Sequence, residues 1–146
     1  MAKLPKPIPG LVIRYSYLWA REYDLGQDEG RKDRPCAIVL SAQMSIETTT
    51  VVVLPVTHRP PDHDTPAMEI PHSTKRRLGL DDGRSWVVLS EANQFTWPGF
   101  DLRPSVPGDA ASVAYGELPA NFFRDLRAAF ARAYRARRAR MVPRSD

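Results

Sequence analysis

Two apolar runs decide the fold of this chain, GRKDRPCAIVLS at residues 30–41 and TVVVLPVTH at residues 50–58. Both runs are rich in aliphatic and β-branched residues, and both have the length of a buried strand. The short connection at residues 42–48 predicts that they pair as an antiparallel hairpin. The first strand begins at Pro35, because proline cannot donate to a ladder and is tolerated at the start of a strand or on an edge.

Each of these strands carries a polar side chain at one end. Arg34 precedes Pro35, which holds it in an extended conformation, and Thr57 closes the second strand. A guanidinium offers a rigid fork of donors, and a hydroxyl donates one more hydrogen bond. If the two ends are neighbours they can grip a phosphate together, so the pair points to a site that cleaves nucleic acid.

The rest of the chain predicts short strands joined by irregular loops, as its 14 prolines suggest. The charged stretch at residues 20–33 contains two glycines and little apolar content, so we expect a mobile surface loop there. Ser73 or Thr74 is expected to cap a helical turn at residues 75–78 that Gly79 closes. Further strands are expected at residues 11–19, 67–70, 85–91, 94–97 and 113–118, with a proline-rich loop at residues 58–66.

A helix is predicted near the C-terminus, because apolar side chains recur there at helical spacing. Continuing its helical wheel places Arg137 and Arg140 on the apolar face, so the packed helix should end near Tyr134 or Arg135, with a projecting or frayed basic end after it. Residues 118–146 hold eight arginines and two aspartates, a net charge of +6. This charge fits general attraction to RNA, DNA or an acidic protein, and it fits a solubilising helix end equally well. The apolar face consists of Phe122, Phe123, Leu126, Phe130, Ala133 and Tyr134.

Length and composition favour a single domain over residues 1–146, with a basic extension at about 135–146. No apolar run approaches the roughly 20 residues that span a bilayer, and the first residues lack the apolar core of a signal peptide, so we expect a cytoplasmic protein without membrane contact. The single cysteine, Cys36, lies inside an apolar strand and is expected in the core. The histidines His58, His63 and His72 lack the spacing of metal ligands.

The two central strands resemble those of the PemK/MazF-like toxins of bacterial toxin-antitoxin systems. The pattern is Arg-Pro, two small residues, a hydrophobic residue and Val-Leu-Ser, followed by a Val-rich strand that ends in Pro, a hydrophobic residue and Thr. Weaker matches extend the resemblance over most of residues 9–134. They are PGLVI at residues 9–13, WVVL at 86–89 followed by Glu91, and YGEL at 115–118.

This resemblance implies an α+β, mostly β fold, a small SH3-like antiparallel β-barrel of the PemK/MazF/CcdB type with a C-terminal helix. It also implies an endoribonuclease toxin that cuts single-stranded RNA without metal or cofactor, with the neighbouring 2′-hydroxyl as nucleophile. Such a toxin is expected to act as a homodimer and to be neutralised by a small, acidic antitoxin protein.

The resemblance assigns the catalytic roles to Arg34 and Thr57, which would stabilise charge on the phosphate. Glu91 lies near the place where relatives often have an acidic residue, and it is the third catalytic candidate. The general base is left open among Glu91, Glu29 and His58. Without the resemblance, Arg34 would be interpreted as a surface residue paired with Asp33 or Glu29, and Thr57 as a β-former.

Substrate contacts are expected from Glu29, Lys32, His58 and Trp97. Trp97 is the tryptophan expected to be most exposed, because it adjoins Pro98 and Gly99, and an exposed aromatic ring can stack on an unpaired base. Relatives carry a Gln-hydrophobic-Arg-Thr segment where this chain has NQFT at residues 93–96. Phe95 therefore stands in place of an arginine and removes one substrate-binding cation.

Two other functions are compatible with the sequence. A non-catalytic nucleic-acid-binding or regulatory module would use the same barrel and the basic tail. It would bind RNA and leave it intact, and Arg34→Ala would change this binding little. A CcdB-like toxin shares the fold class but binds DNA gyrase, so it would inhibit gyrase without cutting RNA.

Overall fold

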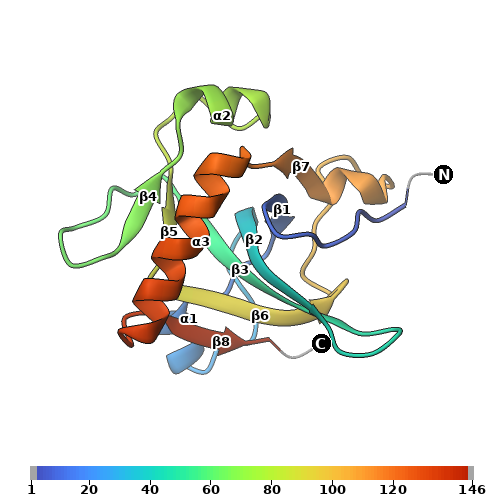
Figure 1. Ribbon diagram of the computed structural model, residues 1–146. Coiled ribbons are helices and arrows are strands. Elements are labelled where there is room, and N and C mark those ends of the chain that lie inside the picture. The colour runs from blue at the N-terminus through green and yellow to red at the C-terminus, as the bar shows by residue number, and fades with distance from the viewer. Residues whose placement is uncertain (1–2, 145–146) are drawn as a thin grey trace.

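The computed structural model describes residues 3–144 and shows a mostly antiparallel sheet with short helices and one longer C-terminal helix (Figure 1). The helices are α1 Ala20–Asp24, α2 His72–Arg77 and α3 Ala120–Arg135, with the short 3-10 helix η1 Ala110–Val113. The strands are β1 Leu11–Tyr15, β2 Arg34–Gln43, β3 Thr49–Thr57, β4 Ala67–Glu69, β5 Trp86–Val88, β6 Glu91–Trp97, β7 Ala114–Glu117 and β8 Arg140–Pro143.

Strand β3 is the centre of the sheet. One of its edges pairs with β2, which confirms the predicted hairpin. Its other edge is shared, because residues 49–53 pair with β6 and residues 56–57 pair with β5. The chain from β5 to β6 therefore runs antiparallel along β3 with a break at residues 89–90. The strand order is β4-β5-β3-β2-β1-β7.

The mostly β antiparallel fold with a C-terminal helix agrees with the expectation, but closure into a barrel is not seen. Among residues 3–144 the end strands β4 and β7 do not pair with each other. Strand β6 instead continues the sheet to β8, with which it pairs in parallel.

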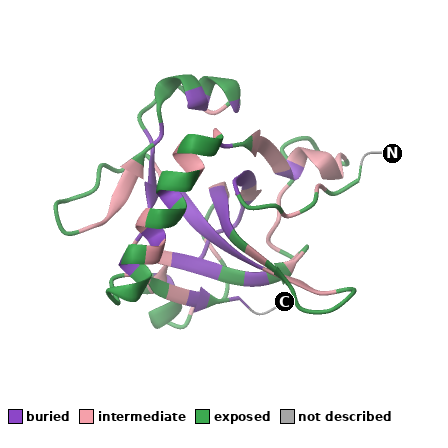
Figure 2. Ribbon diagram, in the orientation of Figure 1, coloured by how far each residue is buried: buried purple, intermediate pink, exposed green. Residues whose placement is uncertain are grey.

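Alternation along the central strands fills two apolar layers. Val52 and Leu54 of β3 face the layer under α3, which also takes Leu126 and Phe130 of that helix. Val51 and Val53 face the opposite layer, where Cys36 is fully buried as expected. Figure 2 shows this burial concentrated in the central strands, while the outer side of α3 is exposed.

The segment after β1 corrects two expectations. β1 ends at Tyr15, and residues 20–24 form the short helix α1 within the stretch expected to be a loop. The helix begins here because the carboxylate of Glu22, which is buried, accepts a hydrogen bond from the backbone N–H of Trp19 at 3.1 Å. Gly30 packs against residues 16–17, between β1 and α1, so closely that a Cβ at this position would overlap the carbonyl group of Tyr17.

Helix α2 also begins earlier than predicted. Its N-cap is Pro71, and Ser73 and Thr74 lie inside the helix, so neither is the cap. Proline fits the start of a helix because its missing N–H would have no partner there. Gly79 follows the helix with φ +71°, a left-handed conformation that favours glycine.

As far as residue 144, the segment after α3 is not the frayed end that was expected, and residues 145–146 of the predicted extension lie outside the described residues. After α3 the chain turns back, and β8 pairs with β6 from Glu91↔Arg140 to Gln94↔Pro143. Arg144 then enters the interior, where its side chain is only 2% exposed. Its guanidinium donates to the carbonyl of Ser16 at 2.8 Å and to the carboxylate of Asp101 at 2.8 Å. Helix α3 ends at Arg135, as the helical wheel predicts, but the segment after it is not frayed, because partners distant in sequence stabilise it.

Arg144 also donates to the side-chain oxygen of Asn93 at 3.0 Å. Asn93 is fully buried and bonds both polar groups of the Leu18 backbone, the N–H at 2.9 Å and the carbonyl at 2.8 Å. These two hydrogen bonds hold the backbone of Leu18 beside β6, in the way that ladder hydrogen bonds hold a neighbouring strand.

We predict that Arg144→Ala lowers the free energy of unfolding by about 3 kcal/mol, because it leaves Asp101 and Asn93 without their buried partner. Urea denaturation measures this value. The matched control is Arg132→Ala on the exposed side of α3, which should change stability by less than about 0.5 kcal/mol. Equal stability of the two variants would show that the C-terminal segment is dispensable.

Candidate active site

A cleft of about 720 Å³ lies at the end of the sheet where β2 begins and β3 ends. Its walls come from the start of α1, the ends of β2 and β3, the loop at residues 58–66, the junction of β5 and β6, and residues of β4, α2 and the segment that precedes β5. Hairpin geometry explains the location. Cys36 pairs with Pro55, so continuing the antiparallel register by two residues brings Arg34 opposite Thr57.

Arg34 lies in the cleft wall with its charge poorly compensated. One terminal nitrogen donates to the carbonyl of Val56 at 3.3 Å, and the guanidinium carbon lies 4.9 Å from the ring centre of Trp19. Its Nε is buried and has no hydrogen-bond partner among the described residues. Burial lowers the pKa of Arg34 from its ordinary value. The expected alternative of pairing with Asp33 is not observed, because Asp33 contacts Arg14 and Arg103.

Thr57 lines the same cleft and keeps its proton available. Its Oγ1 accepts a hydrogen bond from the backbone N–H of Arg59 at 3.2 Å. A hydroxyl can accept and donate at once. The contact therefore orients the oxygen and leaves the O–H free for an acceptor in the cleft.

Glu91, at the start of β6, is half-buried in the cleft wall. Its Oε1 accepts hydrogen bonds from the backbone N–H of Ala20 at 2.7 Å and from the hydroxyl of Tyr17 at 3.1 Å. Burial raises the pKa of Glu91, although these two hydrogen bonds oppose the shift. A carboxyl with a raised pKa is suited to proton transfer near neutral pH.

The wall beside Thr57 is held by a buried lysine. Lys75 donates to Asp81 at 2.6 Å and to the hydroxyl of Ser85 at 2.7 Å, and it also bonds the carbonyl of Gly83. The hydrogen bond from Lys75 holds the pKa of Asp81 below its usual range. Asp81 in turn contacts His58 Nε2 at 2.7 Å, while His58 Nδ1 lies 2.9 Å from the carbonyl of Arg84.

The structure brings together five of the seven residues selected from the sequence, Arg34, Thr57, Glu91, Lys32 and His58. The other two, Glu29 and Trp97, do not line the cleft. Trp97 packs on the core, where its ring centre lies 6.3 Å from that of Phe95. Phe95 itself is buried and stacks on Tyr15 at 4.6 Å, so this position faces the core.

Sequence reasoning did not assign a site role to Trp19, Arg21, Tyr17 or Lys75. Two tryptophans, Trp19 and Trp86, line the cleft, and Arg21 also lies over the ring of Trp19, at 5.4 Å. The alternation of aromatic residues at positions 15, 17 and 19 gave the only signal, and it was interpreted as a continuing strand. Lys75 had no signal, because it sits in a basic run that is typical of a solvated helix.

The profile of one protein family matches residues 17–96, which is more than half of the chain. That family is described as the PemK-like, MazF-like toxin of type II toxin-antitoxin systems. The chain belongs to this family. Its members are typically ribonucleases, and membership implies a cognate antitoxin. No curated protein and no solved structure matches the chain.

The matched range contains the whole Arg34, Thr57 and Glu91 arrangement of this toxin-family chain, and it ends one residue after Phe95. Helix α3 and strand β8 lie outside it. Among residues 3–144, no group of three or more His, Cys, Asp or Glu side chains is placed to hold a metal ion. In the same part of the chain, no helix is both long and apolar enough to cross a membrane.

We predict that Glu91→Gln changes the pH dependence of stability. Because the folded-state pKa of Glu91 is raised, the folded wild type binds more protons than the unfolded chain in the pH window just above the ordinary carboxyl pKa. Its free energy of unfolding therefore falls as pH rises through that window. Glutamine keeps an acceptor for Ala20 and Tyr17 but does not titrate, so the variant should gain stability relative to wild type between pH 4 and pH 7.

Urea denaturation at both pH values measures this difference. Glu47→Gln, in the exposed connection between β2 and β3, is the control for the loss of one carboxylate. If the difference in free energy of unfolding between Glu91→Gln and wild type does not change with pH, the raised pKa assigned to Glu91 is contradicted.

Proposed function

We propose that this toxin-family chain is an endoribonuclease that cuts single-stranded RNA without a metal, using the neighbouring 2′-hydroxyl as nucleophile. The observation that carries the proposal is the half-buried guanidinium of Arg34, whose Nε has no partner, in one cleft with the free hydroxyl hydrogen of Thr57. An incompletely paired buried cation is unfavourable by itself. A phosphate in the cleft would satisfy it.

The proposed reaction is a transesterification. The 2′-oxygen attacks phosphorus and loses its proton, the bond from phosphorus to the 5′-oxygen breaks, and the products are a 2′,3′-cyclic phosphate and a 5′-hydroxyl. Arg34 and Thr57 donate hydrogen bonds to the phosphoryl oxygens, where negative charge grows in the transition state. Trp19 restricts the guanidinium plane by its cation–π contact.

Glu91 is the proposed base that removes the proton of the 2′-hydroxyl. Of the three candidates for the base, Glu29 does not line the cleft, and both ring nitrogens of His58 already contact protein groups. His58 lies in the same wall as a proposed contact for the RNA, and the leaving 5′-oxygen takes its proton from the solvent. Lys32, which also lines the cleft, supplies a further cation for the RNA backbone.

The partners of the proposal are single-stranded RNA, a second copy of the chain and a small acidic antitoxin. An acidic antitoxin suits the chain's net charge of +4. The two alternatives keep distinct signatures. A non-catalytic module would bind RNA and leave it intact, and a gyrase-binding toxin would inhibit gyrase. The incompletely paired Arg34 beside Thr57 favours the nuclease over both.

We predict that the purified chain makes discrete cuts in a long, weakly structured RNA in the presence of a chelator. Arg34→Ala and Thr57→Val should each lower the cleavage rate by about 10²–10³-fold, because each removes a donor to the transition state. Arg34→Lys should recover only part of the loss, since an ammonium lacks the planar fork. Mapping the new 5′ ends by primer extension gives the measurement.

The control is Arg76→Ala on the exposed side of α2, which should cut like wild type. Intact RNA with folded, antitoxin-free wild type would reject the nuclease. Undiminished cutting by Arg34→Ala would reject the assigned site.

A further inference from the structure

A second hollow, of about 630 Å³, lies where α3 ends and the chain turns toward β8. Ser90, Tyr134 and Ala139 line it, together with four arginines that we call the arginine cluster, Arg135, Arg137, Arg138 and Arg140. The family match ends at residue 96, so this cluster is a feature outside the matched range.

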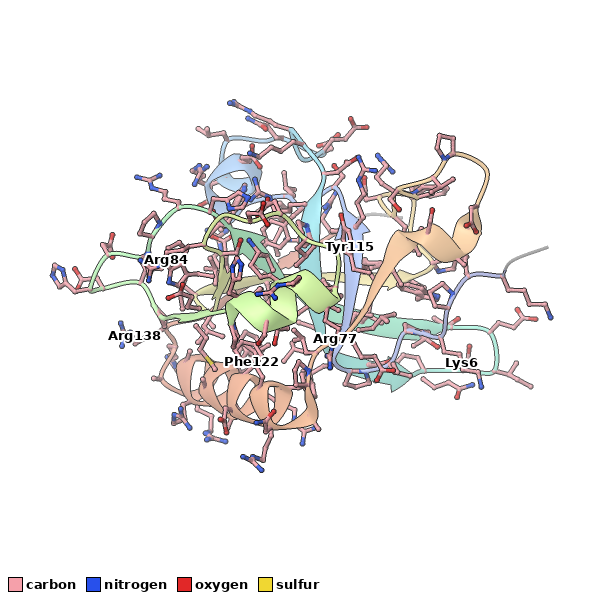
Figure 3. All side chains as sticks on the ribbon, turned by 90° about the horizontal axis from the view of Figure 1, so that it is seen from above. Lys6, Arg77, Arg84, Tyr115, Phe122 and Arg138 are labelled. Atoms are coloured by element: carbon pink, nitrogen blue, oxygen red, sulfur yellow. The ribbon has the colours of Figure 1, made fainter. Side chains whose placement is uncertain are left out.

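The hollow adjoins the catalytic cleft. Ser90 lines both of them, and its carbonyl accepts a hydrogen bond from the backbone N–H of Arg140 at 2.9 Å. Arg138 donates to the carbonyl of Asp64 at 3.0 Å, in the loop at residues 58–66 that forms a wall of the cleft. In Figure 3, Arg138 accordingly lies beside that loop. An RNA chain that leaves the cleft over Ser90 would therefore reach the arginine cluster directly.

Much of the charge of the cluster is uncompensated. Among residues 3–144, Arg135 and Arg137 form no ion pair, and both are exposed. The hydrogen bond of Arg138 goes to a neutral carbonyl, so its charge also persists. Only Arg140 is neutralised, by a two-pronged contact with Asp24. Its role is to fix the turn against α1.

The conformation of Arg137 adds an independent observation. Its φ is +57°, and the bonds from Arg137 N–H to Tyr134 and from Arg138 N–H to Ala133 form a Schellman motif. Glycine is the usual residue at this left-handed position, because a Cβ is unfavourable there. The backbone conformation of this turn does not favour an arginine. The presence of arginine at position 137 must therefore be explained by its side chain.

The lining indicates which kind of anion fits. A peptide that docks in a groove needs apolar pockets for its anchors, and here, among residues 3–144, the only apolar or aromatic residues of the lining are Ala139 and Tyr134. Tyr134 is 54% exposed beside guanidinium groups. Exposed aromatic rings among cations are typical of surfaces that stack unpaired bases and contact the phosphates between them.

We propose that the arginine cluster is a second phosphate-binding subsite, which holds RNA nucleotides that flank the one bound in the catalytic cleft. This inference rests on the proposed ribonuclease function and adds to it a longer RNA footprint. Arg135, Arg137 and Arg138 contact phosphates, and Tyr134 stacks on a base.

The test compares two double variants that each remove two positive charges, one at the C-terminal end of α3 and the other in its first half. One is Arg135→Gln with Arg137→Gly, where glycine also suits the turn. The control is Arg124→Gln with Arg127→Gln, on the exposed side of α3 at its other end. The probe is a labelled 15-nucleotide single-stranded RNA with 2′-O-methyl groups throughout, which lacks the nucleophile and stays intact. Fluorescence anisotropy at several salt concentrations gives the affinity and its salt dependence.

The cluster variant should bind about tenfold more weakly, and the slope of log affinity against log salt should fall by about 1.4, since each lost phosphate contact on a single strand removes about 0.7. The control variant should keep the slope of wild type. Equal losses in both variants, or no loss in either, would overturn the inference. So would equally tight binding of a poly-glutamate of matched charge, because it would assign the cluster to an acidic protein.

A two-nucleotide RNA separates this inference from the proposed function, since its single phosphate is the one that is cut and no flanking phosphate remains for the arginine cluster. Wild type and the cluster variant should cut it at equal rates. Failure of wild type to cut any RNA rejects the proposed function, whereas cutting with unchanged affinity in the cluster variant rejects only the second subsite.

Discussion

The cleft depends on one buried polar residue, Asn93. Its side-chain amide bonds the N–H and the carbonyl of Leu18 and fixes the following residue, Trp19, against Arg34. Glu91 lies two positions earlier on the same face of β6 and therefore reaches the N–H of Ala20. A single strand register thus places both the proposed base and the support of Arg34, the proposed phosphate ligand, and slipping it by one residue would remove both.

Two arginines illustrate how burial separates a structural cation from a binding one. Arg144 is almost completely buried, and its guanidinium donates hydrogen bonds to Ser16, Asn93 and Asp101. Its charge is therefore compensated within the fold. Arg34 is less buried, yet its Nε has no partner and one terminal nitrogen makes a single long contact at 3.3 Å. The charge of Arg34 is therefore less completely compensated within the described chain than that of Arg144. This difference supports the proposal that an anionic ligand binds Arg34.

The sequence predicted the features that depend on local pattern. The hairpin, the helix at the C-terminus and the pairing of Arg34 with Thr57 follow from residue period and from the antiparallel register. The position of Trp19 does not, because it depends on Asn93, which lies more than 70 residues away. For the same reason the sequence did not indicate that Trp97 packs on Phe95 outside the cleft, since the adjoining Pro98 and Gly99 say nothing about that packing.

Strand β8 shows the limit of local reasoning most clearly. Its only aliphatic run is the pair Met141 and Val142, which is too short to predict a strand by itself, and three further arginines precede the strand, so the local pattern favours a solvated tail. What makes it a strand is pairing with β6 and the burial of Arg144 against Asn93. The C-terminal residues lie outside the family match, yet they stabilise the asparagine that positions Trp19. The turn before β8 also carries the arginine cluster beside Ser90, so the same segment both supports the cleft and extends the basic surface next to it.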